Sequence, residues 1–245
     1  MRLACRIDGR VGTASTIVHS LAYPKSFPLM NHRSPSAERI CTAALEHFAQ
    51  RGYDGASLSE VAEAVGIRKA SLYAHFKNKD ALFLEALADA VAVEWQFALD
   101  CFAATETPLP EPLSSEQHGP ERAIPGHAYC AALLERYAQS VHLRFLLRTA
   151  YGPPLALKPL IGQHYEPFIA NIGELFAQSV SQQWLVTPLD AAQTRQYALA
   201  YSGIVESLYV ELIYTGGTLL DARRQALWAL MEDSLRWLSQ RRQGQ

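Results

Sequence analysis

One stretch, residues 57–80 (SLSEVAEAVGIRKASLYAHFKNKD), limits the folds open to this chain more than any other part of it. Ser57 and Glu60 have the S-x-x-E spacing of a capping box, which satisfies free amides at a helix start. Gly66 follows where a helix ends and the backbone needs a left-handed residue. Beyond it, Leu72 gives a second short helix its buried side. The stretch therefore predicts two short helices joined by a tight turn, an arrangement that can present a row of side chains to the major groove of DNA.

The second of these helices has cations, hydroxyls and an aromatic ring on its outward side, because Leu72 and Phe76 face inward. Phosphates and the edges of bases are contacted by such groups. The outward residues are Arg68, Lys69, Ser71, Tyr73, His75 and Lys77. An ordinary helical hairpin with a solvated polar side has the same spacing, so the pattern alone leaves DNA binding and a plain hairpin open.

Residues 36–85 resemble the DNA-binding domain of the TetR (tetracycline-repressor-like) family of bacterial transcription regulators. The most specific part is the fragment SLYAHFKNK at residues 71–79, with a tyrosine three residues before a phenylalanine and a lysine at the start of the next helix. Other matching residues are Ala37, Ile40, Phe48, Gly52, Tyr53, Ser57, Leu58, Ile67 and Leu82. The family usually has a small hydroxyl residue at the position of Arg68, which cannot cap the recognition helix in that way.

The resemblance implies an all-α fold, with an N-terminal three-helix helix-turn-helix DNA-binding domain and a C-terminal helical domain for ligand binding and dimerisation. It also implies a role on DNA for individual positions. The candidates for base contact are Arg68, Lys69, Ala70, Tyr73 and Ala74. The candidates for phosphate contact are Ser57, Ser71, Tyr73, His75 and Lys79.

Composition divides the chain into three parts. Residues 1–33 show no helical period and are interpreted as a disordered extension, or as untranslated sequence if Met30 is the true start. Residues 34–80 form the expected DNA-binding domain, and residues 81–245 form the expected effector-binding and dimerisation domain. Within the latter, residues 105–126 hold five prolines and two glycines, which predicts a flexible loop.

The rest of the chain has helical periodicity. Asn78 caps an expected long helix from Lys79 to about Ala103, which connects the two domains. Further helices are expected at about 127–150, 159–184, 187–214 and 218–241. The third is expected to begin at a Thr187 cap, with Pro188 and Asp190 in its first turn, and the fourth at a capping box of Thr218 and Asp221.

Charge is unevenly distributed along the chain. The net charge is only −2, but residues 68–79 hold four cations and no acid, while residues 81–245 carry 11 basic and 17 acidic groups. A basic patch on a neutral domain, attached to an acidic body, would orient the molecule on DNA.

Other classes of protein find little support. The four cysteines are widely spaced and no H-x-x-x-H pair occurs, so neither a metal nor a cofactor is expected. A glycine-rich phosphate loop and a G-x-S-x-G motif are also missing, which argues against an enzyme. No apolar run is long enough for a membrane span and no signal peptide is recognisable, so a reducing, cytoplasmic setting is expected.

Two C-terminal helices carry apolar stripes. The stripe residues are Tyr197, Tyr201, Ile204, Leu208 and Leu212 on one helix and Leu227, Met231 and Leu235 on the other. They are either intramolecular core or, as the resemblance implies, the interface of a homodimer in which two helices of each chain form a four-helix bundle. Such a dimer would set two recognition helices about 34–36 Å apart on a palindromic operator.

The resemblance further implies a pocket for a small effector among the aromatic helices of the body. The expected lining residues are Tyr137, Arg144, Arg148, Tyr165 and Glu206. The charge balance leaves open a neutral, largely apolar effector and one with a single anionic group facing an arginine.

The function expected from these features is that of a DNA-binding transcriptional regulator, a repressor that an apolar effector releases from its operator. Release would follow if the effector favoured a different spacing of the recognition helices. The alternatives are an effector-independent regulator or an activator of the same fold and, more remotely, a helical enzyme or adaptor.

Overall fold

The computed structural model describes residues 33–103 and 124–243, and within these ranges the chain forms helices and no β-strand. The all-α fold expected from the sequence is therefore confirmed. The α-helices are α2 (Pro35–Gly55), α3 (Leu58–Ala64), α4 (Lys69–Tyr73), α5 (Lys79–Ala103), α6 (His127–Gln139), α7 (Val141–Tyr151), α8 (Lys158–Ser179), α9 (Ala191–Tyr214) and α10 (Leu220–Gln243). A 3-10 turn, η1 (Leu155–Leu157), precedes α8, and a π-helical turn, η2 (Val180–Trp184), follows it.

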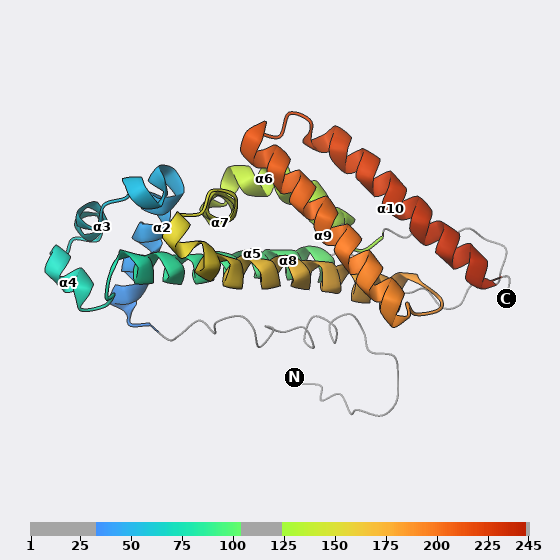
Figure 1. Ribbon diagram of the computed structural model, residues 1–245, viewed down its shortest axis with the longest axis horizontal. Helices are drawn as coiled ribbons and strands as arrows, with labels where there is room; N and C mark the ends of the chain where they lie inside the picture. The colour runs from blue at the N-terminus through green and yellow to red at the C-terminus, as the bar shows by residue number, and fades with distance from the viewer. Residues whose placement is uncertain (1–32, 104–123, 244–245) are drawn as a thin grey trace, which may run out of the picture.

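The molecule is elongated, and α2, α3 and α4 lie at one end of it (Figure 1). The two helices α5 and α8 run along the long axis and pack against each other, while α9 and α10 form the opposite end. Because α7 packs against both α2 and α5, the body of the molecule is in direct contact with the N-terminal helices.

The first helix follows from its cap and its apolar stripe. The Ser34 side chain accepts a hydrogen bond from the backbone N–H of Ala37, and Pro35 occupies the first turn, where no N–H partner is lost. Phe48 is fully buried on the inward side. Gly52 has a φ of 72°, which interrupts the helix. A glycine occupies this position because residues with a Cβ rarely adopt a positive φ.

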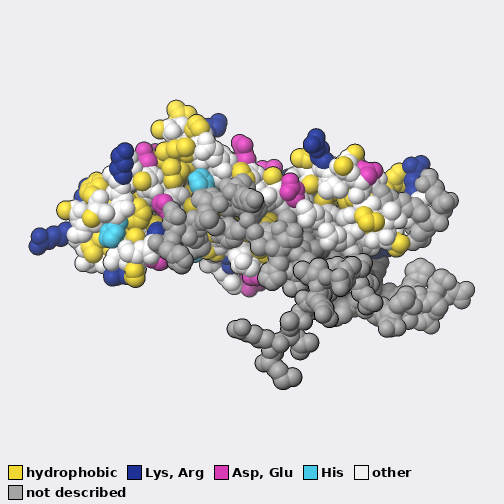
Figure 2. Space-filling model, turned by 90° about the horizontal axis from the view of Figure 1, so that it is seen from below, with side chains coloured by type: hydrophobic (Ala, Val, Ile, Leu, Met, Phe, Trp, Pro, Cys, Tyr) yellow, Lys and Arg dark blue, Asp and Glu magenta, His cyan; other side chains and the backbone are white. Residues whose placement is uncertain are grey.

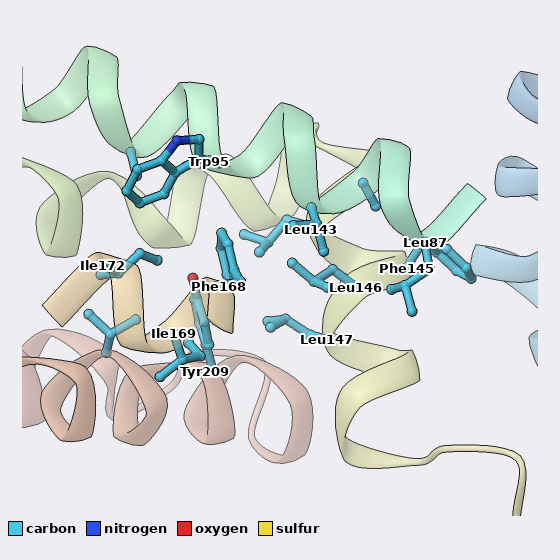
Figure 3. Packing of buried hydrophobic residues seen from close by; sticks show 14 of the residues in the cluster. Leu87, Trp95, Leu143, Phe145, Leu146, Leu147, Phe168, Ile169, Ile172 and Tyr209 are labelled. Atoms are coloured by element: carbon cyan, nitrogen blue, oxygen red, sulfur yellow. The ribbon is translucent and has the colours of Figure 1, made fainter. Parts of the chain in front are cut away.

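A continuous core joins the N-terminal helices to the body. The ring of Phe83 on α5 lies 4.9 Å from that of Phe48 on α2 and 5.3 Å from that of Phe145 on α7, and both contacts are edge-to-face. Deeper in the body, buried side chains of α5, α7, α8 and α9 interdigitate, as Figure 3 shows for Trp95, Leu143, Leu146, Phe168, Ile172 and Tyr209. A displacement of α7 therefore acts on α2 and α5 through Phe145.

A buried ion pair determines where α6 ends and α7 begins. Glu94 of α5 is only 1% exposed and accepts hydrogen bonds from Nε and Nη2 of Arg136 at 3.0 and 2.8 Å. The Ser140 hydroxyl donates to the same carboxylate at 2.7 Å and accepts from the N–H of Leu143, which caps α7. The single helix expected over 127–150 is wrong, because the extended backbone of Ser140 breaks it to make these bonds.

The helix starts near the turn agree with expectation only in part. The Ser57 side chain accepts a hydrogen bond from the N–H of Ser59 at 3.2 Å, so Ser57 does cap α3. Glu60, however, pairs with Arg51 of α2, and the expected capping box is replaced by this contact between helices. Asn78 caps α5 as expected, since its Oδ1 accepts from a first-turn N–H at 2.8 Å.

The last two helices begin differently from the prediction. The N-cap of α9 is Asp190, which forms a capping box with Gln193. The Thr218 hydroxyl donates to the backbone oxygen of Thr215, and α10 begins at Leu220. A capping box of Thr218 with the following acid is therefore not formed.

The ends of the described ranges are tied to the body. Arg33, expected from the sequence to lie in a disordered extension, is hydrogen-bonded to Asp89 of α5. Gly126, expected in the flexible loop, precedes α6, and its carbonyl accepts a hydrogen bond from the Tyr201 hydroxyl at 2.7 Å. The expectations for residues 1–32, with the alternative start at Met30, and for residues 104–123 lie outside the described residues.

The apolar stripes of the C-terminal helices point into the single chain. Of the expected interface residues, Tyr197, Tyr201, Ile204, Leu208, Leu212, Met231 and Leu235 are buried, and Leu227 is partly buried against the same core. They are covered because α9 packs on α8 and α6, and α10 packs on α9 and α6. The expectation that these side chains face a second chain is corrected accordingly, and the surface open to a second chain is the outward side of α9 and α10.

None of the helices in the described ranges is both long and apolar enough to cross a lipid bilayer. In the same ranges, no group of three or more His, Cys, Asp and Glu side chains is arranged to hold a metal ion.

Candidate nucleic-acid interface

The turn between α3 and α4 is a Schellman motif. The N–H of Gly66 donates to the carbonyl of Glu63 at 2.9 Å, and the N–H of Ile67 donates to that of Ala62 at 3.0 Å. Gly66 has a φ of 72°, as this motif requires, and Ile67 is partly buried against the core. The turn therefore has the geometry that the glycine predicted.

The inner side of the α3–α4 unit is anchored to α2. Leu72 is fully buried and Phe76 is 6% exposed, as expected from their spacing. Arg39 of α2 donates from Nη2 to the carbonyl of Val65 at 2.7 Å, which satisfies a free carbonyl at the end of α3. These contacts hold α4 as a short, well-supported helix at the tip of the molecule.

The outer side of α4 is open to solvent. The exposed residues are Arg68, Lys69, Ala70, Ser71, Tyr73, Ala74, His75 and Lys77. Arg68 occupies the N-cap position with extended backbone and makes no side-chain capping bond. Among the residues that the structure describes, neither Arg68 nor Lys69 has an acidic partner, and Figure 2 shows basic side chains projecting at this end of the molecule.

Two of the expected phosphate-contacting residues are held by neighbours. Ser57 is half-buried and its hydroxyl caps α3. Lys79 is half-buried as well, and its Nζ lies 4.6 Å from the centroid of the Tyr53 ring. The Tyr53 hydroxyl donates to Asp80, and burial together with this bond raises the pKa of Tyr53 to about 12. The ammonium group of Lys79 is therefore oriented at the start of α5.

A pocket of about 540 Å³ lies where α2 meets the body. Its lining residues are Ala49 of α2, Tyr137 of α6, Arg144, Arg148, Tyr151 and Gly152 of α7 and its end, and Ile213 and Tyr214 of α9. This space is within the range of small-molecule sites, about 300–1,000 Å³. We name it the junction pocket.

The junction pocket brings together three of the five expected effector-lining residues, Tyr137, Arg144 and Arg148. Tyr165 and Glu206 are not among its lining residues. Tyr165 donates a hydrogen bond at 3.1 Å to the hydroxyl of Tyr151, which does line the pocket. Glu206 is half-buried, and burial raises the pKa of its carboxyl.

Sequence reasoning missed five of the lining residues, Ala49, Tyr151, Gly152, Ile213 and Tyr214. Arg144, Arg148 and Tyr151 are four and three residues apart, so their shared side of α7 was a signal available in the sequence. Ala49 and Tyr214 carried no such signal, because they are distant in the chain and adjoin α7 only in the folded protein.

Comparison with known proteins agrees with the geometry of the N-terminal helices. Residues 40–86 match the family described as bacterial regulatory proteins, tetR family. IcaR of Staphylococcus aureus, the negative transcriptional regulator of the biofilm operon icaADBC, is 41% identical over 46 residues. That match covers 19% of this chain and 25% of IcaR, so the chain spans about a quarter of the length of this relative.

Two solved structures resemble the fold over most of the chain. A Mesorhizobium loti protein described as a TetR-family transcriptional regulator has a TM-score of 0.56 and 20% identity, over 81% of this chain and 98% of its own. The fatty acid degradation regulator FadR from Bacillus halodurans has a TM-score of 0.54 and 18% identity, over 80% of this chain and 96% of its own. Identity at this level reflects a shared fold alone. The N-terminal helices thus match the tetR family of bacterial regulatory proteins in sequence, and most of the chain shares its fold with a solved protein described as a TetR-family regulator.

Proposed function

We propose that this protein is a sequence-specific DNA-binding transcriptional regulator, a homodimer that represses from a palindromic operator and leaves it when a small effector binds. The observation that carries the proposal is the exposed polar side of α4, where Arg68 and Lys69 have no acidic partner among the described residues. Uncompensated cations on a short helix, anchored from behind by Leu72, suit the acceptor groups of guanine and of phosphate.

The residues of this surface divide by the contacts that suit them. Arg68 and Lys69 can reach guanine O6 and N7, and the methyl groups of Ala70 and Ala74 suit the thymine methyl. Tyr73, with 47% of its surface exposed, adds an aromatic ring and a hydroxyl. The groups proposed for phosphate contact are Ser57, Ser71, Tyr73, His75 and Lys79.

A second copy of the chain is part of the proposal, because one short recognition helix reads too few base pairs. Two copies related by a twofold axis would place their recognition helices one turn of DNA apart, about 34–36 Å. Apolar side chains on the outward sides of α9 and α10 support this interface. Leu199 and Leu230 are 67% and 69% exposed, and Trp237 is 54% exposed.

The proposed regulator represses transcription and is released from DNA by an effector. IcaR is a negative regulator by name, which supports the direction of control. The junction pocket supports release, because it touches α2 of the DNA-binding domain as well as α7 and α9 of the body. An effector that preferred one arrangement of these helices would shift the dimer away from the spacing that fits the operator.

The test is fluorescence anisotropy of the purified protein on the DNA upstream of its own gene, beside a random duplex of equal length. At about 0.15 M salt, a regulator of this kind should bind the upstream DNA about a thousandfold more tightly than the random duplex. Absence of binding to any DNA at low salt would overturn the proposal.

Variants separate base contacts from phosphate contacts in the same assay. Lys69→Ala should relax sequence choice, at a cost of about 1–3 kcal/mol for one base pair. Lys79→Ala should weaken binding to both duplexes and reduce the salt slope by up to about one unit. Glu174→Gln, on the exposed side of α8 and outside both proposed surfaces, is the control and should change neither quantity. Equal effects of both lysine variants on both duplexes would contradict the assigned roles.

A further inference from the structure

The junction pocket contains two arginines of α7 and no acidic lining residue. Arg144 and Arg148 are one helical turn apart and both line the pocket, so their side chains come from the same side of the helix. An anion bound between them could accept charge-assisted hydrogen bonds from both. Because the only charged groups among its described lining residues are arginines, this pocket suits a negatively charged ligand.

Arg144 is held in place with part of its guanidinium unused. Its Nη1 donates to the carbonyls of Tyr137 at 3.0 Å and Ala138 at 2.8 Å, at the end of α6. Within the described residues, its Nε and Nη2 have no recorded hydrogen-bond partner. That pair of donors forms the fork that binds a carboxylate through two parallel hydrogen bonds.

Arg148 lies against the DNA-binding domain. A Cβ added to Gly52 would be 3.2 Å from its Nη2 and 3.3 Å from its Nε, so the guanidinium rests on the left-handed turn of α2. Among the described residues, it makes no ion pair. An anion that binds Arg148 therefore acts directly on the contact between α7 and α2.

The one acid expected among the lining residues does not line the pocket with these arginines. Glu206 is outside the pocket lining, and burial raises the pKa of its carboxyl. The other lining groups are mainly aromatic or apolar, including Tyr137, Tyr151 and Ile213. They suit an apolar or aromatic body attached to the anionic group.

We propose that the junction pocket binds an organic carboxylate, with the carboxylate at Arg144 and Arg148 and its apolar body among the tyrosines, and that this ligand is the effector. The second half of the inference rests on the proposed function. Of the two kinds of effector that the sequence left open, the structure favours the anionic one. Because the ligand touches Ala49 as well as α7 and α9, it would bias the position of α2 relative to the body.

The first experiment measures binding without DNA, by ligand-detected NMR titration. The probes are benzoate, 3-phenylpropanoate and octanoate, each beside its neutral amide, with inorganic sulfate as the anion without an apolar body. Probes of about ten heavy atoms should bind with dissociation constants of roughly 4–10 mM, as expected for ligands of this size. At least one acid should bind about tenfold more tightly than its amide, since charged hydrogen bonds contribute about 1.5–3 kcal/mol.

Variants locate the bound acid. Arg148→Gln should weaken the acid about tenfold or more and leave the amide unchanged, because its side chain has no other recorded polar contact to lose. Arg144→Gln should act in the same direction, and thermal unfolding followed by circular dichroism checks that both variants remain folded. Arg195→Gln, an arginine on the exposed side of α9, is the matched control and should bind the acid like the wild type.

The inference is overturned if no acid binds at about 50 mM, well above the expected dissociation constants of roughly 4–10 mM, or if the amides or sulfate bind as tightly as the acids. Unchanged acid binding in folded Arg148→Gln and Arg144→Gln would overturn it as well.

A second experiment adds the tightest acid to the complex with upstream DNA, where it should lower DNA affinity. Acid binding with unchanged DNA affinity overturns the effector role alone. A protein that binds no DNA but binds the acid through Arg148 overturns the proposed function and leaves the site standing.

Discussion

The packing of α8 against α9 leads to a sharp prediction about one glycine. Gly173 of α8 is buried, and a Cβ placed on it would lie 2.4 Å from the carbonyl oxygen of Ala198 on α9. Ordinary contacts begin near 3.4 Å, so the two helices would have to separate by about 1 Å. The obstacle is backbone, which cannot rotate away as the end of a side chain can.

The expected cost of Gly173→Ala follows from two opposing effects. Overpacking a tight core costs about 1–3 kcal/mol, while replacing a glycine in a helix by alanine stabilises it by about 1 kcal/mol. Gly162 of α8 is the matched control, because its added Cβ would meet only the flexible Glu166 carboxylate, at 3.2 Å. The difference between the two variants is then the overpacking cost alone, about 1–3 kcal/mol.

Thermal unfolding at one fixed protein concentration measures this difference. For a chain of this size, about 2–4 °C of melting temperature corresponds to 1 kcal/mol, so Gly173→Ala should melt about 2–12 °C below Gly162→Ala. Equal melting temperatures, or a higher one for Gly173→Ala, would show that α8 and α9 do not approach as closely as the structure has them.

Three further predictions concern the ion pair, the outward surface and the response to pH. Arg136→Met should lower the free energy of unfolding in urea by about 3 kcal/mol. This is the low end for a broken buried ion pair, because Ser140 still donates to Glu94; an unchanged urea midpoint would contradict the buried pair. Gly203→Glu should convert a dimer to a monomer in light scattering, because like charges would meet across a twofold axis, while the fold of the single chain has open space for the side chain. Gly203→Ala is the control, and an intact Gly203→Glu dimer would show that the interface lies elsewhere. Burial lowers the pKa of His164, so, as far as this group is concerned, the folded protein is most stable above the unfolded-state pKa of about 6.5 and loses stability as pH falls below it. His164→Gln should therefore flatten the fall of the urea midpoint between about pH 7 and pH 5, and an unchanged dependence of that midpoint on pH would rule this out.

The helix-turn-helix could be predicted from the sequence because its signals are short-range. The Gly66 turn, the Asn78 cap and the inward side of α4 at Leu72 all depend on residues within a few positions. Even there, the partner of Glu60 was beyond reach, because Arg51 comes to it from another helix.

The break at Ser140 shows why the body was harder to predict. The pattern over 127–150 is that of one helix, and nothing local competes with it. Glu94, more than forty residues earlier in the chain, provides the buried carboxylate that Arg136 and Ser140 bind, and the helix ends to satisfy it. A buried charge without partners is too costly to leave, so a tertiary contact overrides the local period.

The junction pocket, too, could be predicted from the sequence only in part. The sequence named Tyr137, Arg144 and Arg148 as lining groups, but it left the sign of the ligand open and could not connect them to Ala49 or Tyr214.

By itself, the sequence determined the helical class, the helix-turn-helix and the row of side chains that α4 exposes, because these follow from spacing, caps and turns along the chain. The tertiary structure decided which sides of α9 and α10 are buried, where α6 ends, and that two arginines without acidic partners line one pocket beside α2. An apolar stripe has the same period whether it faces its own core or another chain, so only packing could settle these points.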